Sequence, residues 1–151
     1  MVTYIEQGNI FKLEGVNNYA HGCNCIGAMG KGIAVQFKIK FPLMYKEYKS
    51  LCVSGGFNLG DVFAYNYGNG YVFNLGTQTS WRTKAEIKAI EKSLKNMLFF
   101  ASEQDIKEIA LPKIGAGLGG LQWFEVKNII DIVSKEYSDI ELFVVENYQE
   151  E

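Results

Sequence analysis

Histidine, proline and cysteine are scarce in this chain of 151 residues, which has one histidine, two prolines and three cysteines. Cys23 and Cys25 lie beside the single histidine, His21, and this grouping suggests a metal site. A closed zinc site needs four ligands, and the sequence offers no second Cys/His pair, so we expect no metal and no cofactor. Small buried cysteines on a strand explain the pattern more simply.

Long apolar runs are also missing, since no stretch approaches the ~18 residues that cross a membrane. The segment Met1–Glu6 has neither the basic region nor the apolar region of a signal peptide. An odd number of cysteines without such a signal is typical of free thiols in a reducing compartment. We therefore expect a cytoplasmic protein with no membrane partner.

Net charge is low as well, at −2 with a pI near 5.5, so no general binding to nucleic acid is expected, although a local basic patch remains compatible with these values. Hydrophobic residues make up 48% and charged residues 21%, which is ordinary for a globular chain. No linker, repeat or charge block divides the sequence. We predict a single domain spanning residues 1–151.

Glycine, in contrast, is plentiful, and it is concentrated after two apparent strands. Residues 108–114 form an apolar run with the length of a buried strand, the glycine-rich segment 115–120 follows, and residues 122–137 show helical periodicity. A strand, a glycine loop and a helix together present backbone N–H groups to a phosphate. The six residues also match the G-x-G-x-x-G pattern of dinucleotide sites. That pattern belongs to the first βα unit of a long array, whereas here one helix and one strand remain, so we interpret the loop as a phosphate cradle. A plain tight turn is the alternative.

A second glycine-rich loop, residues 26–32, follows a strand expected at 19–25 and leads into a helical pattern beginning at Ile33. Further strands are expected at 2–6, 61–66, 71–75 and 141–145, the middle two forming a hairpin. A long helix is expected from Thr83 to about Ser102, with Thr83 and Glu86 as a capping box. Alternating strands and helices predict an α/β fold: a three-layer α/β/α sandwich with a mixed central sheet. Both glycine loops would lie at the carboxyl ends of strands, where such sheets bind ligands.

Three segments in this order resemble the macrodomain family, the ADP-ribose-binding module: residues 7–10, 21–34 and 111–123. The resemblance covers nearly the whole chain and is strongest to the branch with ADP-ribose 1″-phosphate phosphatases, terminal ADP-ribose glycohydrolases and DNA ADP-ribose glycohydrolase antitoxins. It implies that the partner is ADP-ribose or a phosphorylated or conjugated form of it. The contact residues that it implies are Asn9, Ile10, Asn24, Gly30, Lys31, Gly32, Ile33, Ile114, Gly115, Ala116, Gly117, Leu118, Gly119, Gly120 and Asn147.

The resemblance also implies a direction for the ligand. Asn9 stands where the family usually has an aspartate that binds the adenine amino group, and Ile10 would contact the adenine through its backbone. Asn24 matches an asparagine near the distal ribose. Residues 30–33 would contact the distal ribose and phosphates, residues 115–120 would wrap the pyrophosphate, and residues 146–148 would lie beside the adenine.

Two departures concern catalysis. The terminal glycohydrolases resemble this branch and use a lysine and an aspartate, but the matching positions here are about Gln78 and Gly119. Phosphatase-like members have a histidine at the position of His21, so we consider His21 and Asn24 as candidate catalytic residues. A buried structural histidine is the equally weighted alternative.

These residues are compatible with three alternative functions. The first is a phosphatase acting on ADP-ribose 1″-phosphate, through His21, Asn24 and the two loops. The second is a hydrolase that removes ADP-ribose from protein or nucleic acid. The third is a reader that binds ADP-ribose without catalysis. The sequence favours the first and supports the ligand class more strongly than the reaction.

Overall fold

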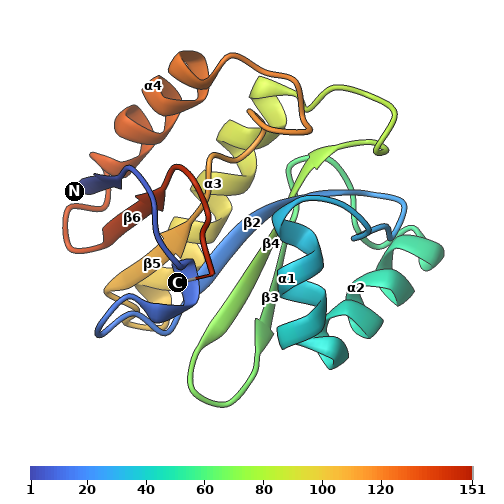
Figure 1. Ribbon diagram of the computed structural model, residues 1–151, viewed down its shortest axis with the longest axis horizontal. Helices are drawn as coiled ribbons and strands as arrows, with labels where there is room; N and C mark the ends of the chain where they lie inside the picture. The colour runs from blue at the N-terminus through green and yellow to red at the C-terminus, as the bar shows by residue number, and fades with distance from the viewer. Residues whose placement is uncertain (151) are drawn as a thin grey trace.

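A six-stranded mixed sheet forms the middle layer of the computed structural model, which describes residues 1–150 (Figure 1). The strand order is β1-β6-β5-β2-β4-β3. All neighbouring strands are parallel except β3 and β4, which form an antiparallel hairpin. The strands are β1 (Val2–Ile5), β2 (Tyr19–Asn24), β3 (Val62–Asn66), β4 (Tyr71–Gln78), β5 (Glu108–Leu111) and β6 (Glu141–Val145).

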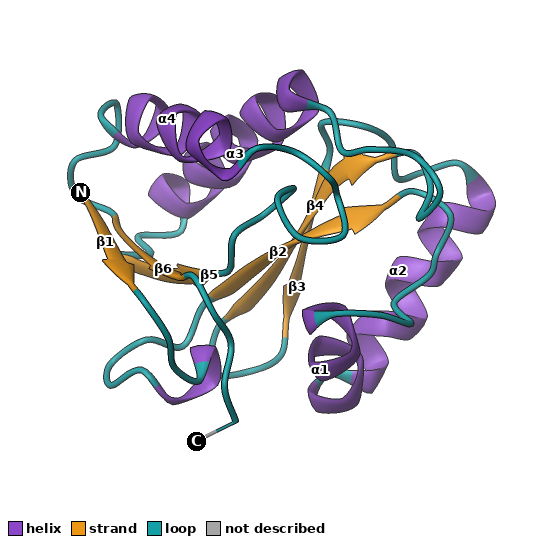
Figure 2. Ribbon diagram, turned by 45° about the horizontal axis from the view of Figure 1, so that its top comes forward, coloured by secondary structure: helices purple, strands orange, loops and turns teal. Residues whose placement is uncertain are grey.

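Helices cover both faces of this sheet, as Figure 2 shows. The pair α1 (Ile33–Lys40) and α2 (Pro42–Ser54) lies on one face, and the pair α3 (Ile87–Glu103) and α4 (Trp123–Ser134) lies on the other. A short 3-10 helix, η1 (Ile10–Lys12), follows β1. The predicted three-layer α/β/α sandwich with a mixed sheet is confirmed.

Two apolar clusters hold the layers together, one on each face of the sheet. On the α3–α4 face, Leu94 and Ile130 pack against Leu142 of β6. On the α1–α2 face, Phe37 and Tyr48 are fully buried. Alternate residues of β2 point to opposite faces, because side chains along a strand alternate: Tyr19 and Cys23 belong to the second cluster and Ala20 to the first.

Two predicted elements have different boundaries. The run expected as a strand over 108–114 ends as a strand at Leu111, because Pro112 lacks an N–H for the ladder and the Ile114 N–H instead bonds the Pro112 carbonyl oxygen. The long helix begins at Ile87 and not at Thr83. The predicted capping box does not form, because the Thr83 hydroxyl bonds Ser80 and the Glu86 N–H bonds the Thr77 carbonyl oxygen.

The two edges of the sheet differ in how they are formed. β3 and β4 are neighbours in sequence, whereas β1 pairs only with β6, with Val2 opposite Leu142. Beyond this pair, the Gly8 N–H bonds the Asn147 carbonyl oxygen at 3.1 Å, and the Asn9 side-chain amide donates to the Glu150 carbonyl oxygen at 2.8 Å. No helix of the described chain is long and apolar enough to cross a membrane.

Candidate functional site

A cleft of about 670 Å³ opens at the carboxyl ends of the central strands. Its walls are the loop after β2 (residues 25–32, the first loop), the loop after β5 (residues 112–122, the second loop), the end of β4 and the segment after β6. Its size and its position at the carboxyl ends of parallel strands are typical of small-molecule sites in α/β folds.

Backbone amides supply most of the polar groups of the two loops. Among residues 1–150, the N–H groups of Gly30, Lys31 and Gly32 in the first loop have no acceptor in the chain. The same holds within the described residues for the N–H groups of Gly117 and Leu118 in the second loop. Unpaired N–H groups grouped in this way form a concave site for an anion, without a need for many basic side chains.

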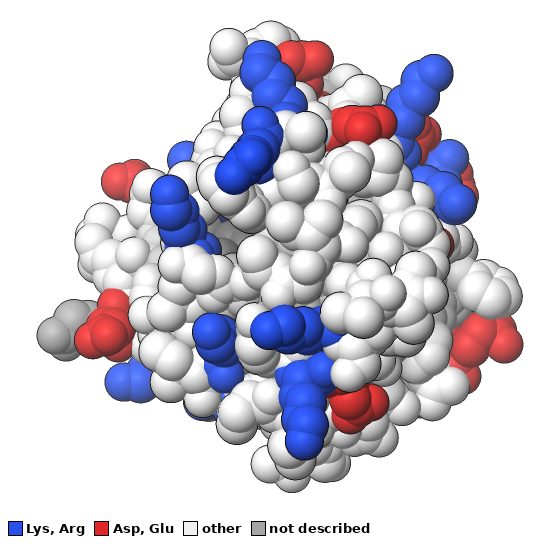
Figure 3. All heavy atoms as spheres, turned by 90° about the vertical axis from the view of Figure 1, so that its right-hand side faces the viewer, with Lys and Arg blue, Asp and Glu red and all other residues white. Residues whose placement is uncertain are grey.

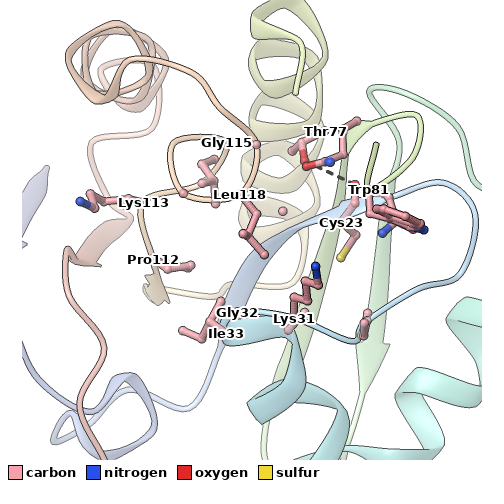
Figure 4. Close-up of a pocket in the computed structure, with 18 of the residues that line it drawn as sticks. Cys23, Lys31, Gly32, Ile33, Thr77, Trp81, Pro112, Lys113, Gly115 and Leu118 are labelled. Carbon is pink, nitrogen blue, oxygen red and sulfur yellow. Dashed lines mark hydrogen bonds between the residues drawn. The ribbon is translucent and has the colours of Figure 1, made fainter. Parts of the chain in front are cut away.

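Gly32 directly precedes α1, and its φ of 64° lies in the left-handed region. It therefore allows the chain to turn from the first loop into the helix, so that Ile33 and Ala34 line the cleft. The Leu118 side chain reaches from the second loop toward this point, since a Cβ at position 32 would lie 3.2 Å from Leu118 Cδ1. Figure 4 shows Leu118 extending between the two loops.

Few ionisable side chains line the cleft. Lys31 extends into it, whereas Lys113 points away from it (Figure 4). Glu146 lies at the other end, and its carboxylate accepts a hydrogen bond from the Trp123 ring N–H at 2.8 Å. An ammonium group aimed into a cleft with unpaired amides favours an anionic ligand.

Asn24 lines the cleft, and its side chain holds the first loop. Its Oδ1 accepts from the N–H groups of Ile26 at 3.2 Å and Ala28 at 3.1 Å, and its Nδ2 donates to the Ala28 carbonyl oxygen at 2.9 Å. The Tyr48 hydroxyl adds a bond to the same Oδ1 at 2.9 Å. These contacts assign Asn24 the role of shaping the loop, and they give no support to the predicted catalytic role.

The structure places His21 outside the cleft, in the core between β2 and α1. It is 1% exposed, its ring stacks on Phe37 at 3.9 Å between centroids, and its Nε2 bonds Asn74 Oδ1 at 2.7 Å. Burial lowers the pKa of His21 to about 4, so the ring is neutral near pH 7. These contacts support the structural alternative for His21 and give no support to the catalytic one.

Cys23 and Cys25 are also unsuited to act as thiolate nucleophiles. Burial raises the pKa of Cys23, and burial together with the neighbouring Cys52 raises the pKa of Cys25 to about 11. Both thiols are therefore protonated near neutral pH. Nowhere in residues 1–150 do three His, Cys, Asp or Glu side chains gather as a possible metal site.

The structure brings together most of the residues expected at the loops. Asn24, Gly30, Lys31, Gly32, Ile33, Ile114, Gly115, Gly117, Leu118 and Gly119 line the cleft. Ala116, Gly120, Asn9, Ile10 and Asn147 do not.

Three residues expected at the adenine lie outside the cleft lining, and their side chains make other contacts. Ile10 is fully buried, the Asn9 Oδ1 accepts from the Phe11 N–H, and the Asn147 amide donates to the Glu6 carbonyl oxygen. Glu146 and Tyr148, expected in the same region, do line the cleft.

The site residues expected from the sequence did not include Thr77, Met29 or Trp81, which line the cleft. Trp81 is 54% exposed and lines the cleft. Its position after β4, outside any apolar periodicity, is the signal that could have identified it. Gln78 also lines the cleft, and its amide donates to the carbonyl oxygens of Ser80 at 2.8 Å and Thr83 at 3.1 Å.

Comparison with known proteins agrees with this geometry. The chain is 35% identical over 144 residues to a DNA ADP-ribosyl glycohydrolase of Thermus aquaticus, covering 93% of this chain and 40% of that protein. It is 30% identical over 147 residues to a human ADP-ribose glycohydrolase, covering 95% of this chain and 90% of that one. The chain thus spans about two fifths of the length of the bacterial relative.

Among solved structures, the macrodomain of Thermus aquaticus DarG superposes with a TM-score of 0.88 at 35% identity, covering 97% of this chain and 98% of that chain. The family model named Macro domain matches residues 20–130, a segment that contains both glycine-rich loops, all of β2 except Tyr19, and the whole of β3, β4 and β5. This chain therefore belongs to the macro domain family.

Proposed function

We propose that the cleft binds ADP-ribose and that the chain hydrolyses the bond between ADP-ribose and a molecule to which it is attached, with nucleic acid as the favoured substrate. The observation that carries the proposal is the pair of facing loops with unpaired backbone amides, together with Lys31 extending between them. A pyrophosphate, with two negative charges on a compact group, suits such a site.

The ends of the cleft fit the two ends of this ligand. Beyond the first loop, the cleft is lined by Asn24, Gln78 and Trp81, which suits the distal ribose and the attached group. At the opposite end it is lined by Val145 and Tyr148, and an aromatic ring beside an aliphatic side chain suits the adenine. The attached group would leave the cleft past Trp81, which is largely exposed.

The relatives favour hydrolysis over other reactions, because both carry the name of an ADP-ribose glycohydrolase. In such a reaction the bond from the ribose C1″ to the attached group breaks, water supplies a hydroxyl to C1″, and the leaving group takes a proton. In this chain the loop amides would fix the pyrophosphate and so position C1″. Lys31, which extends into the cleft, would add a positive charge beside the bound anion.

Binding without reaction is the second candidate, and Gln78 is the observation that favours it. Gln78 stands where the resemblance places a catalytic lysine, and Gly119 stands where it places an aspartate. A glutamine amide already bonded to two carbonyl oxygens neither attacks carbon nor transfers a proton at neutral pH. A phosphatase reaction through His21 has lost its support, because His21 lies in the core.

Calorimetry with ADP-ribose tests the binding proposal. Gly117→Val should weaken binding at least tenfold, because position 117 lines the cleft and a Cβ there meets nothing within 4 Å, so the side chain fills the cleft and not the core. An unchanged melting temperature would show that the fold is intact. Unchanged affinity in a folded Gly117→Val variant would contradict the proposed site.

Release of free ADP-ribose from a single-stranded DNA oligonucleotide that carries it tests the reaction. We expect release by the wild type and slower release by Lys31→Ala. Gln78→Lys restores the lysine that the resemblance places at this position. Tight binding with no release by the wild type, together with release by Gln78→Lys, would establish the reader and overturn the hydrolase.

A further inference from the structure

Positive charge is distributed very unevenly along this acidic chain. The segment 26–54, which contains the first loop, α1 and α2, has five lysines and one glutamate, although the whole chain has a net charge of −2. The rest of the chain is therefore strongly acidic by comparison. Such a local excess is the electrostatic pattern of a surface that binds a polyanion.

These lysines are not neutralised by neighbours. Within the described residues, the only ion pairs are Lys95–Glu91 and Lys107–Asp105, and both lie outside this segment. Lys46 and Lys49 are exposed on α2, where they line a shallow groove with Tyr45. The face of the molecule that carries α2 shows several Lys and Arg side chains, with most acidic groups toward its margins (Figure 3).

Aromatic rings accompany these charges. The Lys38 ammonium lies 4.6 Å from the centroid of the Tyr45 ring, and the Arg82 guanidinium lies 4.7 Å from the Trp81 ring. Trp81 is the most exposed aromatic side chain of the cleft lining. Single-stranded nucleic acids bind where basic side chains hold the backbone and aromatic rings stack on unpaired bases.

The first loop lies against both the groove on α2 and the cleft. The Cys25 N–H bonds the Thr79 carbonyl oxygen at 3.1 Å, which connects the first loop to the segment carrying Trp81. On the other side, the Tyr45 hydroxyl donates to the Gly27 carbonyl oxygen at 3.3 Å, and a Cβ on Gly27 would lie 3.2 Å from Lys49 Cγ. The first loop thus contacts both the segment that carries Trp81 and the side of α2 that carries Tyr45 and Lys49.

We propose that Lys38, Tyr45, Lys46, Lys49, Trp81 and Arg82 form a basic strip that docks a single-stranded polynucleotide whose ADP-ribose occupies the cleft. The proposal rests on the proposed function for the ligand in the cleft and adds to it the surface that holds the attached chain. The strip contacts phosphates and stacks on bases, so it prefers single strands to duplexes. This preference follows because bases in a duplex present no free face to an aromatic ring.

Fluorescence anisotropy with a labelled single-stranded DNA oligonucleotide that lacks ADP-ribose tests the strip apart from the cleft. The decisive variant is Lys46→Glu/Lys49→Glu, which should weaken binding at least tenfold at low salt. The slope of log K against log salt concentration should become shallower by about 1.4, the value for two lost phosphate contacts. The matched control is Lys12→Glu/Lys135→Glu, which changes the net charge equally at two exposed lysines outside the strip. The control should bind almost as the wild type does.

Two further arms define the partner. A ribose oligonucleotide of the same sequence tells whether the strip distinguishes RNA from DNA, and a duplex should bind more weakly than either single strand. Lys46→Gln/Lys49→Gln keeps the proposal testable if the charge reversal does not fold, and its loss of affinity should be smaller but in the same direction.

Calorimetry with free ADP-ribose separates the two proposals. Lys46 and Lys49 lie outside the cleft, so the variant at these positions should keep the wild-type affinity for ADP-ribose. Suppose that ADP-ribose binds normally and that Lys46→Glu/Lys49→Glu binds the oligonucleotide as well as the control Lys12→Glu/Lys135→Glu does. The proposed strip is then wrong, and the proposed cleft stands. If the wild type binds the oligonucleotide but no ADP-ribose, the proposed function fails and the strip stands.

Discussion

The first and second loops border the same cleft, but different groups hold them in place. Side chains hold the first loop: Asn24 bonds its backbone, the Tyr48 hydroxyl donates to Asn24, and the Tyr45 hydroxyl donates to the Gly27 carbonyl oxygen. The second loop is instead held by close packing at two glycines, where there is no room for a side chain. Position 115 fits against Ile90 of α3, and position 119 fits against the backbone of position 115 and against Ala85.

This difference teaches that the two loops can be broken by opposite changes. Removing a side chain should loosen the first loop, because its amides lose their acceptors. Adding a side chain should displace the second loop, because it approaches α3 too closely for a Cβ. Both loops leave backbone N–H groups unpaired toward the cleft, so two unlike supports produce the same kind of surface.

The largest effect is expected at Gly119. A Cβ there would lie 2.6 Å from the Gly115 carbonyl oxygen and 2.9 Å from Ala85 Cβ, so Gly119→Val should destabilise the protein by about 4 kcal/mol or more. Urea unfolding measures the loss. Gly117→Val is the matched control in the same loop, since its Cβ meets nothing within 4 Å. Equal stability of the two variants would contradict the packing account of the second loop.

A smaller loss is expected when Asn24→Ala removes the support of the first loop. The Ile26 and Ala28 N–H groups would lose their acceptor, which costs about 3 kcal/mol. Proteolysis should then cut within residues 25–32 before it cuts the second loop. Asn58→Ala removes an exposed asparagine that also bonds a backbone oxygen, and it should change stability little. Cutting at both loops alike would show that they are not held independently.

Mild acid should sharpen the comparison further, because β2, which leads into the first loop, contains His21. The pKa of His21 falls from an unfolded value near 6.5 to about 4 in the fold, so the unfolded chain binds the extra proton first. The contribution of neutral His21 to the free energy of unfolding is present in full well above pH 6.5, and it declines as the pH falls toward 4. Between pH 6.5 and 5 the loss is about 1.6 kcal/mol.

The measurement is urea unfolding of the wild type and His21→Gln across pH 5 to 7. His21→Gln retains a donor for Asn74 and does not titrate, so its stability should vary less over this range. Parallel curves for the two proteins would contradict the buried, neutral histidine.

The sequence allowed the architecture and the two loops to be predicted because both rest on local patterns. Apolar runs and glycine-rich segments mark the strand ends, and the hairpin signal at residues 68–70 located the antiparallel pair. The boundary of α3 was wrong because Thr83 found a closer partner in Ser80 than in Glu86.

The roles of single polar residues were harder to predict, because they depend on contacts between distant segments. His21 and Asn24 have side chains suited to catalysis. However, Phe37 stacks on the His21 ring, and the Asn24 Oδ1 already accepts two N–H groups of the first loop and one hydroxyl of α2. No local pattern reports such burial. Trp81 was underestimated for the converse reason, since a tryptophan is usually packed and this one lines an open rim.

The pairing of β1 with β6 has a consequence for biosynthesis. Val2 and Leu142 become neighbours only after nearly the whole domain has been translated, which takes roughly 7–30 s at 5–20 residues per second. Through that interval the first strand made has no strand partner, so the sheet grows from its centre and closes last at the edge that was synthesised first. Contacts of such long sequence separation slow folding. A ribosome stalled before residue 141 should therefore hold a domain that lacks both β6 and an ordered β1.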